Sequence, residues 1–570
     1  MRPVPRTLLA AVTCLSATAA LAQPKPTPVP EDYPGPLQVE WGPIRTFDGP
    51  RPGDRVSRMY FVHLDRTDQE AQLFLPGNAR TIRGVIVHLG WAYEPHKPHL
   101  QEYARARGFA VLGGMWRYAR LPDVIPQALA HLAKELDVPG LEHAPLLMMG
   151  FSRTGSKAVR FAVYQPERTV SVFFGGSPGL TLGIADKNPE RAQRALDALR
   201  GIPCITISGS QDAFVGINKE AKRGYFDWER VHYPKIRAAR LPVTAACEWG
   251  PGHESFNNGA LLLPFWDGVW RGRVSDDADP VKGPVALKPF PEEAGYLVTA
   301  GDWGTDPDGK LVPASAAADH LGEPVPLREF RGDPATAVWL PDAYTAAVWR
   351  AFVERPRGIA LAASASGSSI RLAVRSERPE PVESAQFCDG NRLLGRADRA
   401  PFEIETLELG SPRGVHSVFA VCMAGGVKYY TAPIQVLGGT VVDQKAGEER
   451  ARQVPGDLAG LVVDVDALAT LRALRADRAQ DSASPSPRTP VPAPARAAAA
   501  RQVIGLLRSP FDEQRMLATK ALKEFAPELA EAIRGEIASG PVDDPKIRSF
   551  LESLADSTAA PSATQPDNSR

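Results

Sequence analysis

Leu146-Leu147-Met148-Met149-Gly150-Phe151-Ser152-Arg153-Thr154-Gly155 is the stretch of sequence that decides the fold. Its apolar first half predicts a buried strand, and the residues that follow, to Ala162, have the pattern of a helix. Ser152 then falls on the tight turn between the two elements, near the partial positive charge of the helix N-terminus. Such a turn presents a hydroxyl as a nucleophile. The alternative is that Ser152 only caps the helix, which is the commoner role of a serine at this position.

Alternating strands and helices surround this stretch from about residue 41 to residue 275. Several of the strands are apolar along almost their whole length, as in a sheet whose two faces are both covered. The alternation therefore predicts an α/β domain with a mostly parallel sheet, whose functional groups gather at the carboxyl ends of the strands. The expected strands are residues 58–63, 72–75, 84–88, 109–115, 145–149, 170–174, 204–208 and 243–248.

Two further candidate groups follow Ser152 along the chain. The expected strand 204–208 leads to Asp212, and the strand 243–248 leads to His253 on a glycine-containing loop. A serine hydroxyl at neutral pH needs a base, and the base needs a carboxylate that orients it. Since all three groups follow strands, we expect them at one edge of the sheet.

With this order of Ser, Asp and His, residues 41–275 resemble an α/β-hydrolase domain of the secreted serine esterase type. The resemblance implies that Ser152 is the nucleophile, His253 the general base and Asp212 its orienting acid. His88-Leu89-Gly90-Trp91 is similar to the oxyanion loop of that superfamily, which implies an oxyanion hole made by the backbone N–H groups of Arg153 and Trp91. Gly90 is the alternative to Trp91.

The serine turn departs from the superfamily pattern G-x-S-x-G at one position. Thr154 stands where the second glycine is expected, and Gly155, one residue later, is not expected to replace it. Arg153 after the serine resembles the turn of glucuronoyl esterases, which implies contact with a substrate carboxyl or oxyanion. Its alternative is a surface arginine on the first turn of the helix.

Other polar and aromatic residues leave alternatives open. Asp186 competes with Asp212 as the acid, His232 competes with His253 as the base, and His88 either touches substrate or bonds within the core. Aromatic residues follow the strands and could wall a substrate cleft, or they could be ordinary packing. They are Trp91, Tyr93, Trp116, Tyr118 and Trp249, of which Trp116, Tyr118 and Trp249 are the expected substrate-binding residues.

The rest of the 570-residue chain predicts further domains and export. Residues 1–22 have the pattern of a signal peptide, with an uncleaved anchor as the alternative, and 23–40 read as a proline-rich linker. We therefore expect a secreted or periplasmic protein without a membrane span after signal removal. The balance of 66 Lys+Arg against 66 Asp+Glu does not suggest a nucleic-acid partner.

The C-terminal half predicts a small β-sandwich and a helical segment. Residues 276–357 read as a connector packed on the first domain, 358–437 as the sandwich, 438–500 as a helix and a Pro/Ala/Ser-rich linker, 501–555 as helices, and 556–570 as a disordered tail. Residues 385–395, 400–402 and 414–417 resemble bacterial Ig-like modules, and 501–555 resemble HEAT-type helical repeats. Cys388 and Cys422 could form a disulfide within the sandwich.

These observations predict a secreted serine hydrolase that cleaves carboxylic esters, of an acylated polysaccharide, a polyester or a similar substrate, through an acyl-enzyme. No metal or organic cofactor is expected. The sandwich and the helical segment could bind a surface or a protein partner. The alternatives are a serine peptidase with the same triad, and a non-catalytic binding protein on a degenerate hydrolase domain.

Overall fold

A computed structural model describes most of the chain between residues 39 and 557. The described residues are 39–63, 66–90, 94–114, 116, 121–177, 189–209, 233, 236–251, 257–299, 322–335, 337–354, 356–366, 368–444, 467, 470–471, 473–474, 491–508, 512–539, 542 and 544–557.

In these residues, nine strands form one mixed sheet in the order β1-β2-β3-β5-β4-β6-β7-β8-β9. Neighbouring strands in the part β5-β4-β6-β7-β8-β9 pair in parallel. The other pairs, β1 with β2, β2 with β3 and β3 with β5, are antiparallel. β1 begins inside the expected linker. The strands are β1 (Val39–Asp48), β2 (Arg55–His63), β3 (Arg66–Leu75), β4 (Gly84–His88), β5 (Phe109–Gly114), β6 (Leu146–Phe151), β7 (Thr169–Gly175), β8 (Cys204–Gly209) and β9 (Val243–Glu248).

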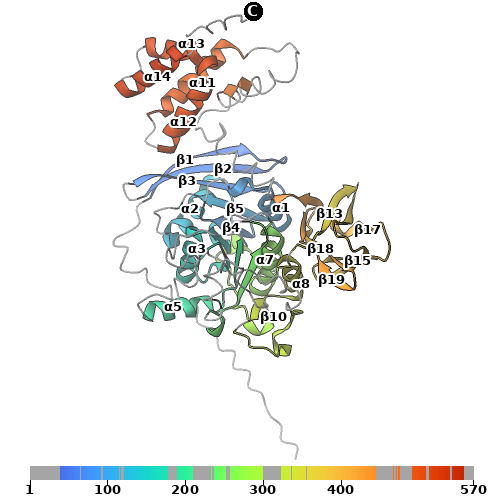
Figure 1. Cartoon of the computed structure of the whole chain (residues 1–570). Helices are drawn as coiled ribbons and strands as arrows, with labels where there is room; N and C mark the ends of the chain where they lie inside the picture. The colour runs from blue at the N-terminus through green and yellow to red at the C-terminus, as the bar shows by residue number, and fades with distance from the viewer. Residues whose placement is uncertain are drawn as a thin grey trace, which may run out of the picture.

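Helices cover both faces of this sheet, as the apolar strands predict. Every residue of β4, β5 and β7 is buried, which requires cover on both sides. Figure 1 shows α2 and α3 on one side of the central strands and α1 and α7 on the other. The helices are α1 (Pro98–Arg107), α2 (Leu121–Glu135), α3 (Arg153–Tyr164), α5 (Pro189–Leu199) and α7 (Gly259–Arg273). The expected α/β architecture is confirmed.

The connector packs on β9 and has strands of its own, which the sequence did not predict. β10 (Tyr296–Thr299) pairs antiparallel with β11 (Val325–Pro326) and β12 (Ala337–Leu340), and α8 (Ala343–Phe352) follows. On β9, Thr244 donates a hydrogen bond to the carbonyl of Trp339 at 2.5 Å. The indole of Trp349 donates to the carbonyl of Ala245 at 2.8 Å. The short 3-10 helices of the chain include η1 (Glu94–His96), η2 (Leu141–His143), η3 (Pro280–Lys282), η4 (Glu292–Ala294), η6 (Leu327–Glu329) and η7 (Glu408–Gly410).

Residues 359–442 form two antiparallel sheets around a shared apolar core that includes Leu372, Phe387 and Val418. One sheet contains β13 (Ile359–Ser366), β14 (Ser369–Ser376) and β17 (Glu403–Thr406). The other contains β15 (Val382–Asp389), β16 (Arg392–Ala397), β18 (Val415–Ala424), β19 (Val427–Tyr430), β20 (Ile434–Leu437) and β21 (Thr440–Val442). Cys388 and Cys422 lie on the paired strands β15 and β18, but they are out of register with each other and both thiols are free.

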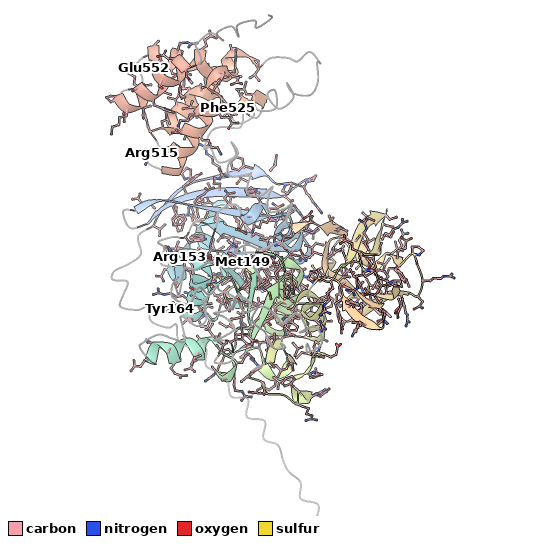
Figure 2. The ribbon with its side chains drawn as sticks, viewed as in Figure 1. Met149, Arg153, Tyr164, Arg515, Phe525 and Glu552 are labelled. Carbon is pink, nitrogen blue, oxygen red and sulfur yellow. The ribbon has the colours of Figure 1, made fainter. Side chains whose placement is uncertain are left out.

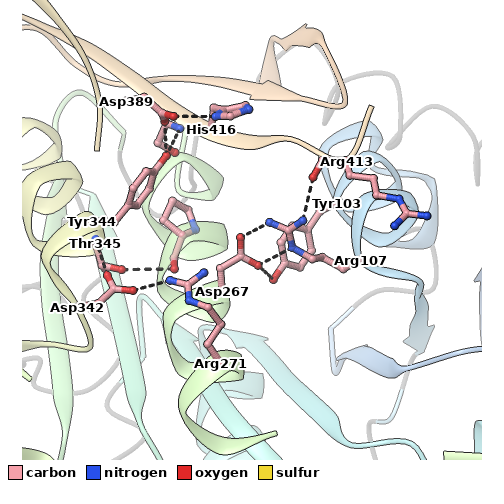
Figure 3. A network of polar contacts seen from close by, with 12 residues as sticks. Tyr103, Arg107, Asp267, Arg271, Asp342, Tyr344, Thr345, Asp389, Arg413 and His416 are labelled. Atoms are coloured by element: carbon pink, nitrogen blue, oxygen red, sulfur yellow. Dashed lines mark hydrogen bonds and ion pairs between the residues drawn. The ribbon is translucent and has the colours of Figure 1, made fainter. Parts of the chain in front are cut away.

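The sandwich is docked tightly on the α/β domain, and Figure 3 shows part of the contact. Arg107 of α1 makes a paired contact with Asp267 of α7, at 2.8 and 2.6 Å, and also donates to the carbonyl of Arg413 at 2.9 Å. Tyr344 of α8 donates to the carboxylate of Asp389 at 2.5 Å. Side chains of the sandwich also join the main core, namely Phe419, Tyr430 and Leu437. The docking is therefore both polar and apolar.

The C-terminal segment is helical (Figure 1), and its apolar side chains form a core separate from that of the α/β domain. Its helices are α11 (Ala493–Leu506), α12 (Asp512–Glu524), α13 (Ala526–Ala538) and α14 (Pro545–Ser557). Phe47 of β1 packs against this core, so the segment meets the sheet at β1. Across the described residues, none of the helices combines the length and the apolar character needed to cross a bilayer.

Candidate active site

Ser152 occupies a strained turn between β6 and α3. Figure 2 labels Met149, which lies on β6, and Arg153, the first residue of α3. Ser152 has φ 56° and ψ −130°, a conformation that non-glycine residues rarely adopt. Its N–H donates to the carbonyl of Gly175 on β7 at 2.8 Å, which ties the turn to the neighbouring strand. The turn is thus held in place from its side.

The capping alternative for Ser152 does not fit this geometry. A capping serine has extended backbone angles, and its hydroxyl accepts a hydrogen bond from the first turn of the helix. Ser152 stands at the N-cap position of α3, but its φ is positive and, within the described residues, its side chain makes no capping hydrogen bond. The hydroxyl is therefore presented at the turn and is not used to complete the helix.

Glycines on each side of Ser152 permit the sharp turn. A Cβ atom at Gly150 would lie 2.2 Å from the carbonyl oxygen of Thr154, and one at Gly155 would lie 2.5 Å from the Cβ of Ser177. The close approach of helix and neighbouring strand thus falls at Gly155. Gly155, one residue later than the second glycine of the G-x-S-x-G pattern, is thus packed closely against Phe174 of β7 and against Ser177 beyond it, and whether it takes the place of that glycine stays an open question of the sequence.

Thr154 has a bonding role in the turn. Its hydroxyl accepts from the N–H of Phe151 at 2.9 Å and donates to the carbonyl of Phe151 at 2.7 Å. Both bonds hold the residue that precedes Ser152. The threonine is therefore a brace of the turn, in a position where a glycine would leave both bonds unmade.

The carboxyl ends of the parallel strands meet at one edge, as the sequence predicts. His88 pairs with Met149, Phe151 pairs with Gly175, and Gly209 of β8 pairs with Glu248 of β9. The segments that begin at this edge contain the other predicted site residues. Those residues, Trp91, Tyr118, Asp186, Asp212, His232 and His253, lie outside the described residues, so their roles stay predictions.

His88 organises the segment that follows β4. Its Nδ1 accepts from the N–H of Gly90 at 3.0 Å, and its Nε2 lies 3.6 Å from the carboxylate of Glu94, which also pairs with Lys97 at 3.0 Å. Burial lowers the pKa of His88 well below its usual value, and the charge of Lys97 lowers it further. The ring is therefore neutral, with its proton on the nitrogen that faces Glu94.

This bonding bears on two alternatives left open by the sequence. His88 bonds within the core, which fits the second of its two interpretations. Gly90 gives its N–H to His88, so it does not fit the role of the alternative oxyanion donor. Sequence reasoning missed Glu94 and Lys97, although their spacing of three residues suggests an ion pair on one helical turn.

Two of the aromatic residues expected to bind substrate make hydrogen bonds within the protein. Trp116 is 1% exposed, and its indole donates to the carbonyl of His88 at 3.3 Å. The indole of Trp249 donates to the carbonyl of Val353 at 2.9 Å. Both fit the packing alternative. Arg153 is exposed on the first turn of α3, which fits a surface arginine.

The described part of the chain places no group of three or more His, Cys, Asp or Glu side chains where it could hold a metal ion.

Comparison with known proteins gives likenesses among solved structures only. No protein family model matches the chain, and no curated protein matches it. An S-formylglutathione hydrolase from Agrobacterium tumefaciens is 12% identical, with a TM-score of 0.28 over 39% of this chain and 95% of that one. An acetyl xylan esterase from Paenibacillus sp. R4 is also 12% identical, with a TM-score of 0.27 over 41% of this chain and 89% of the esterase. A glucuronoyl esterase from Solibacter usitatus is 12% identical, with a TM-score of 0.30 over 43% of this chain and 88% of the esterase.

Proposed function

We propose that this chain is a serine hydrolase with an α/β-hydrolase domain, that it cleaves carboxylic esters, and that Ser152 is its nucleophile. The observation that carries the proposal is the strained positive-φ backbone of Ser152, together with the absence of a capping hydrogen bond from its side chain within the described residues. A strained residue costs about 1–3 kcal/mol and persists where the surroundings hold it and function uses it. Here Gly175 and the Thr154 brace hold the turn.

The position of Ser152 in the sheet also supports the proposal. β6 lies in the interior of the parallel part, between β4 and β7, and both neighbours end at the same edge. α/β-Hydrolases present their serine at this edge, on a strand-to-helix turn, and the acid and the histidine follow later in the chain. Asp212 after β8 and His253 after β9 keep that order.

The proposed reaction proceeds through an acyl-enzyme. Ser152 Oγ attacks the ester carbonyl while His253 takes the hydroxyl proton, and Asp212 holds the imidazole in the required tautomer. When the C–O bond breaks, the imidazolium gives its proton to the departing alcohol. Water then attacks the acyl-enzyme with the same histidine as base and regenerates the serine. The N–H groups of Arg153 and Trp91 are the proposed oxyanion donors, each able to contribute about 3 kcal/mol.

The finer parts of the proposal come from the sequence. The pattern of residues 1–22 supports export, and the appended domains favour a large or immobilised ester such as an acylated polysaccharide or a polyester. Asp186 remains the alternative acid and His232 the alternative base.

The test compares hydrolysis of a panel of p-nitrophenyl esters with hydrolysis of aminoacyl anilides by the full chain. We expect ester hydrolysis that Ser152→Ala and His253→Ala abolish. Asp212→Asn should lower kcat more than Asp186→Asn does, and the reverse would move the acid without changing the reaction class. Preference for the anilides would indicate the peptidase. If the folded protein cleaves neither substrate class, the proposal is refuted, and a non-catalytic binding protein is the remaining alternative.

A further inference from the structure

Trp116 is a buried side chain that the proposed reaction does not use. The sequence assigns it to the substrate cleft, but it is 1% exposed, which leaves almost none of it for a substrate to touch. Its indole lies on Gly114, the last residue of β5, where a Cβ would come within 2.3 Å of the ring. Its ring centroid is 5.3 Å from that of Phe61 on β2. The ring therefore has a fixed place, for which Gly114 leaves the room.

The indole of Trp116 holds the end of β4. Its Nε1–H donates to the carbonyl of His88, the last residue of that strand, at 3.3 Å. The next two backbone N–H groups are bonded as well. Leu89 donates to the carbonyl of Met149 on β6 at 2.9 Å, and Gly90 donates to Nδ1 of His88 at 3.0 Å. Residues 88–90 are thus held by three bonds at the point where the strand ends.

Residues 88–90 lie beside the Ser152 turn. A Cβ at Gly90 would be 3.6 Å from Oγ1 of Thr154, so the space between the two residues is about the size of one methyl group. That hydroxyl makes both hydrogen bonds to Phe151, the residue before Ser152. Since packed interiors transmit small displacements, a shift of residues 88–90 reaches the turn.

The backbone of Trp116 is bonded to the helix that follows Ser152. Lys157 lies one turn into α3, and its ammonium group donates to the carbonyl of Trp116 at 2.9 Å. This bond is one of the interactions that Lys157 makes. Trp116 therefore connects two structures that flank the nucleophile, the end of β4 through its indole and α3 through its carbonyl.

From these contacts we infer that Trp116 is a positioning residue, which fixes the Ser152 turn relative to residues 88–90. The inference rests on the proposed function, in which Ser152 is the nucleophile. Loss of the indole N–H leaves the carbonyl of His88, a residue that is 2% exposed, without this donor, and the end of β4 moves to satisfy it.

The effect falls on the chemical step. A shift of about 1 Å in a reacting group costs about 100-fold in rate, and a smaller shift costs correspondingly less. Binding of the ester does not depend on an indole that is buried away from it. We therefore expect a loss in kcat with little change in KM.

The test compares Trp116→Phe with Trp266→Phe in the full chain. Trp266 is a matched control, because it is 0% exposed, lies on α7 on the other side of the sheet from α3, and has an indole nitrogen that bonds none of the described residues. Both variants lose the same part of a buried ring, so their thermal midpoints should both fall. The difference between them is the hydrogen bond to His88.

We measure kcat and KM with a p-nitrophenyl ester, the rate of fluorophosphonate labelling and the thermal midpoint. Trp116→Phe should lower kcat and the labelling rate about 10-fold, with KM within about twofold of the wild type. Trp266→Phe should keep the wild-type kcat, KM and labelling rate.

A second variant covers the case in which Trp116→Phe does not fold. Lys157→Met removes the donor to the carbonyl of Trp116 and should also lower kcat at unchanged KM, whereas Lys157→Arg keeps a donor and should recover most of the rate. A double-mutant cycle separates this bond from the other interactions of Lys157. If both residues act through the same connection, Trp116→Phe with Lys157→Met is no slower than the slower single variant.

Three results would overturn the positioning role while leaving the proposed reaction intact. They are a wild-type kcat in folded Trp116→Phe or Lys157→Met, an equal loss of kcat in both tryptophan variants, and a loss in the double variant equal to the product of the single losses. Absence of labelling and of ester hydrolysis in the wild type would refute the proposed function, and the positioning role with it.

Discussion

Thr154 stands where the G-x-S-x-G pattern has a glycine. Its replacement tests whether its two hydrogen bonds to Phe151 stabilise the turn or whether the threonine is only tolerated there. Thr154→Val keeps the shape of the side chain and removes both hydrogen bonds to Phe151. A typical hydrogen bond contributes about 1 kcal/mol net, so the loss in the free energy of unfolding is about 2 kcal/mol. For a domain of this size, that corresponds to a fall of about 4–8 °C in the thermal midpoint.

The same substitution should lower the rate at which Ser152 reacts. Without these two bonds, Phe151, the residue that precedes Ser152, is no longer fixed, and the serine can relax from its strained positive-φ backbone. We expect the rate of fluorophosphonate labelling to fall about 10-fold, as for a reacting group displaced by a fraction of an ångström. Thr154→Ser is the matched control, because it keeps the hydroxyl and should label at close to the wild-type rate.

The assay is thermal unfolding together with the second-order labelling rate for the wild type, Thr154→Val, Thr154→Ser and Thr154→Gly. Thr154→Gly restores the superfamily pattern but removes both bonds, so it should resemble Thr154→Val or be worse, since glycine also adds backbone entropy to the unfolded chain. A Thr154→Gly variant more stable and faster than the wild type would refute the role of the brace.

Three other perturbations have defined outcomes. Gly155→Ala should cost about 1–3 kcal/mol because its Cβ meets Ser177, and Ser177→Gly in the same chain should recover part of that loss, as measured in a double-mutant cycle of thermal midpoints. Burial and the charge of Arg58 lower the pKa of His96 to about 4, below the unfolded value of about 6.5, so the unfolded state alone binds a proton between these values. The free energy of unfolding should therefore fall as the pH drops from 7 to 5. In urea unfolding over that range, His96→Gln should lose about 1–2 kcal/mol less of this free energy than the wild type does. An equal loss in both proteins would contradict the lowered pKa of His96. Tyr344→Phe removes the donor to Asp389 and should destabilise the docked sandwich by about 2 kcal/mol, seen as a lower thermal midpoint, whereas an unchanged midpoint would show that this bond contributes little.

The sequence predicts the features that depend on local pattern. Apolar runs between helical patterns are sufficient to locate β4 to β9, and the run that ends at Met149 is sufficient to place Ser152 on a turn. The connector strands β10 to β12 were missed because they span four residues or fewer among Pro, Gly and Asp, where periodicity gives no signal.

Features that depend on the position of distant segments could not be predicted. The bonds from Gln444 and Pro433 to the loop after β9 join parts of the chain more than 170 residues apart. The close packing at Gly155 depends on the approach of α3 to Ser177. The register of β15 and β18, which keeps Cys388 and Cys422 apart, is likewise set by pairing and not by composition.

The most direct measurement of the central claim is the site of covalent labelling. The full chain is treated with a fluorophosphonate, digested, and mapped by peptide mass spectrometry. Stoichiometric modification of Ser152, absent in a folded Ser152→Ala variant and slowed by His253→Ala, is the predicted result. Modification of another serine, or none in a folded sample, would contradict the assignment of Ser152 as the nucleophile.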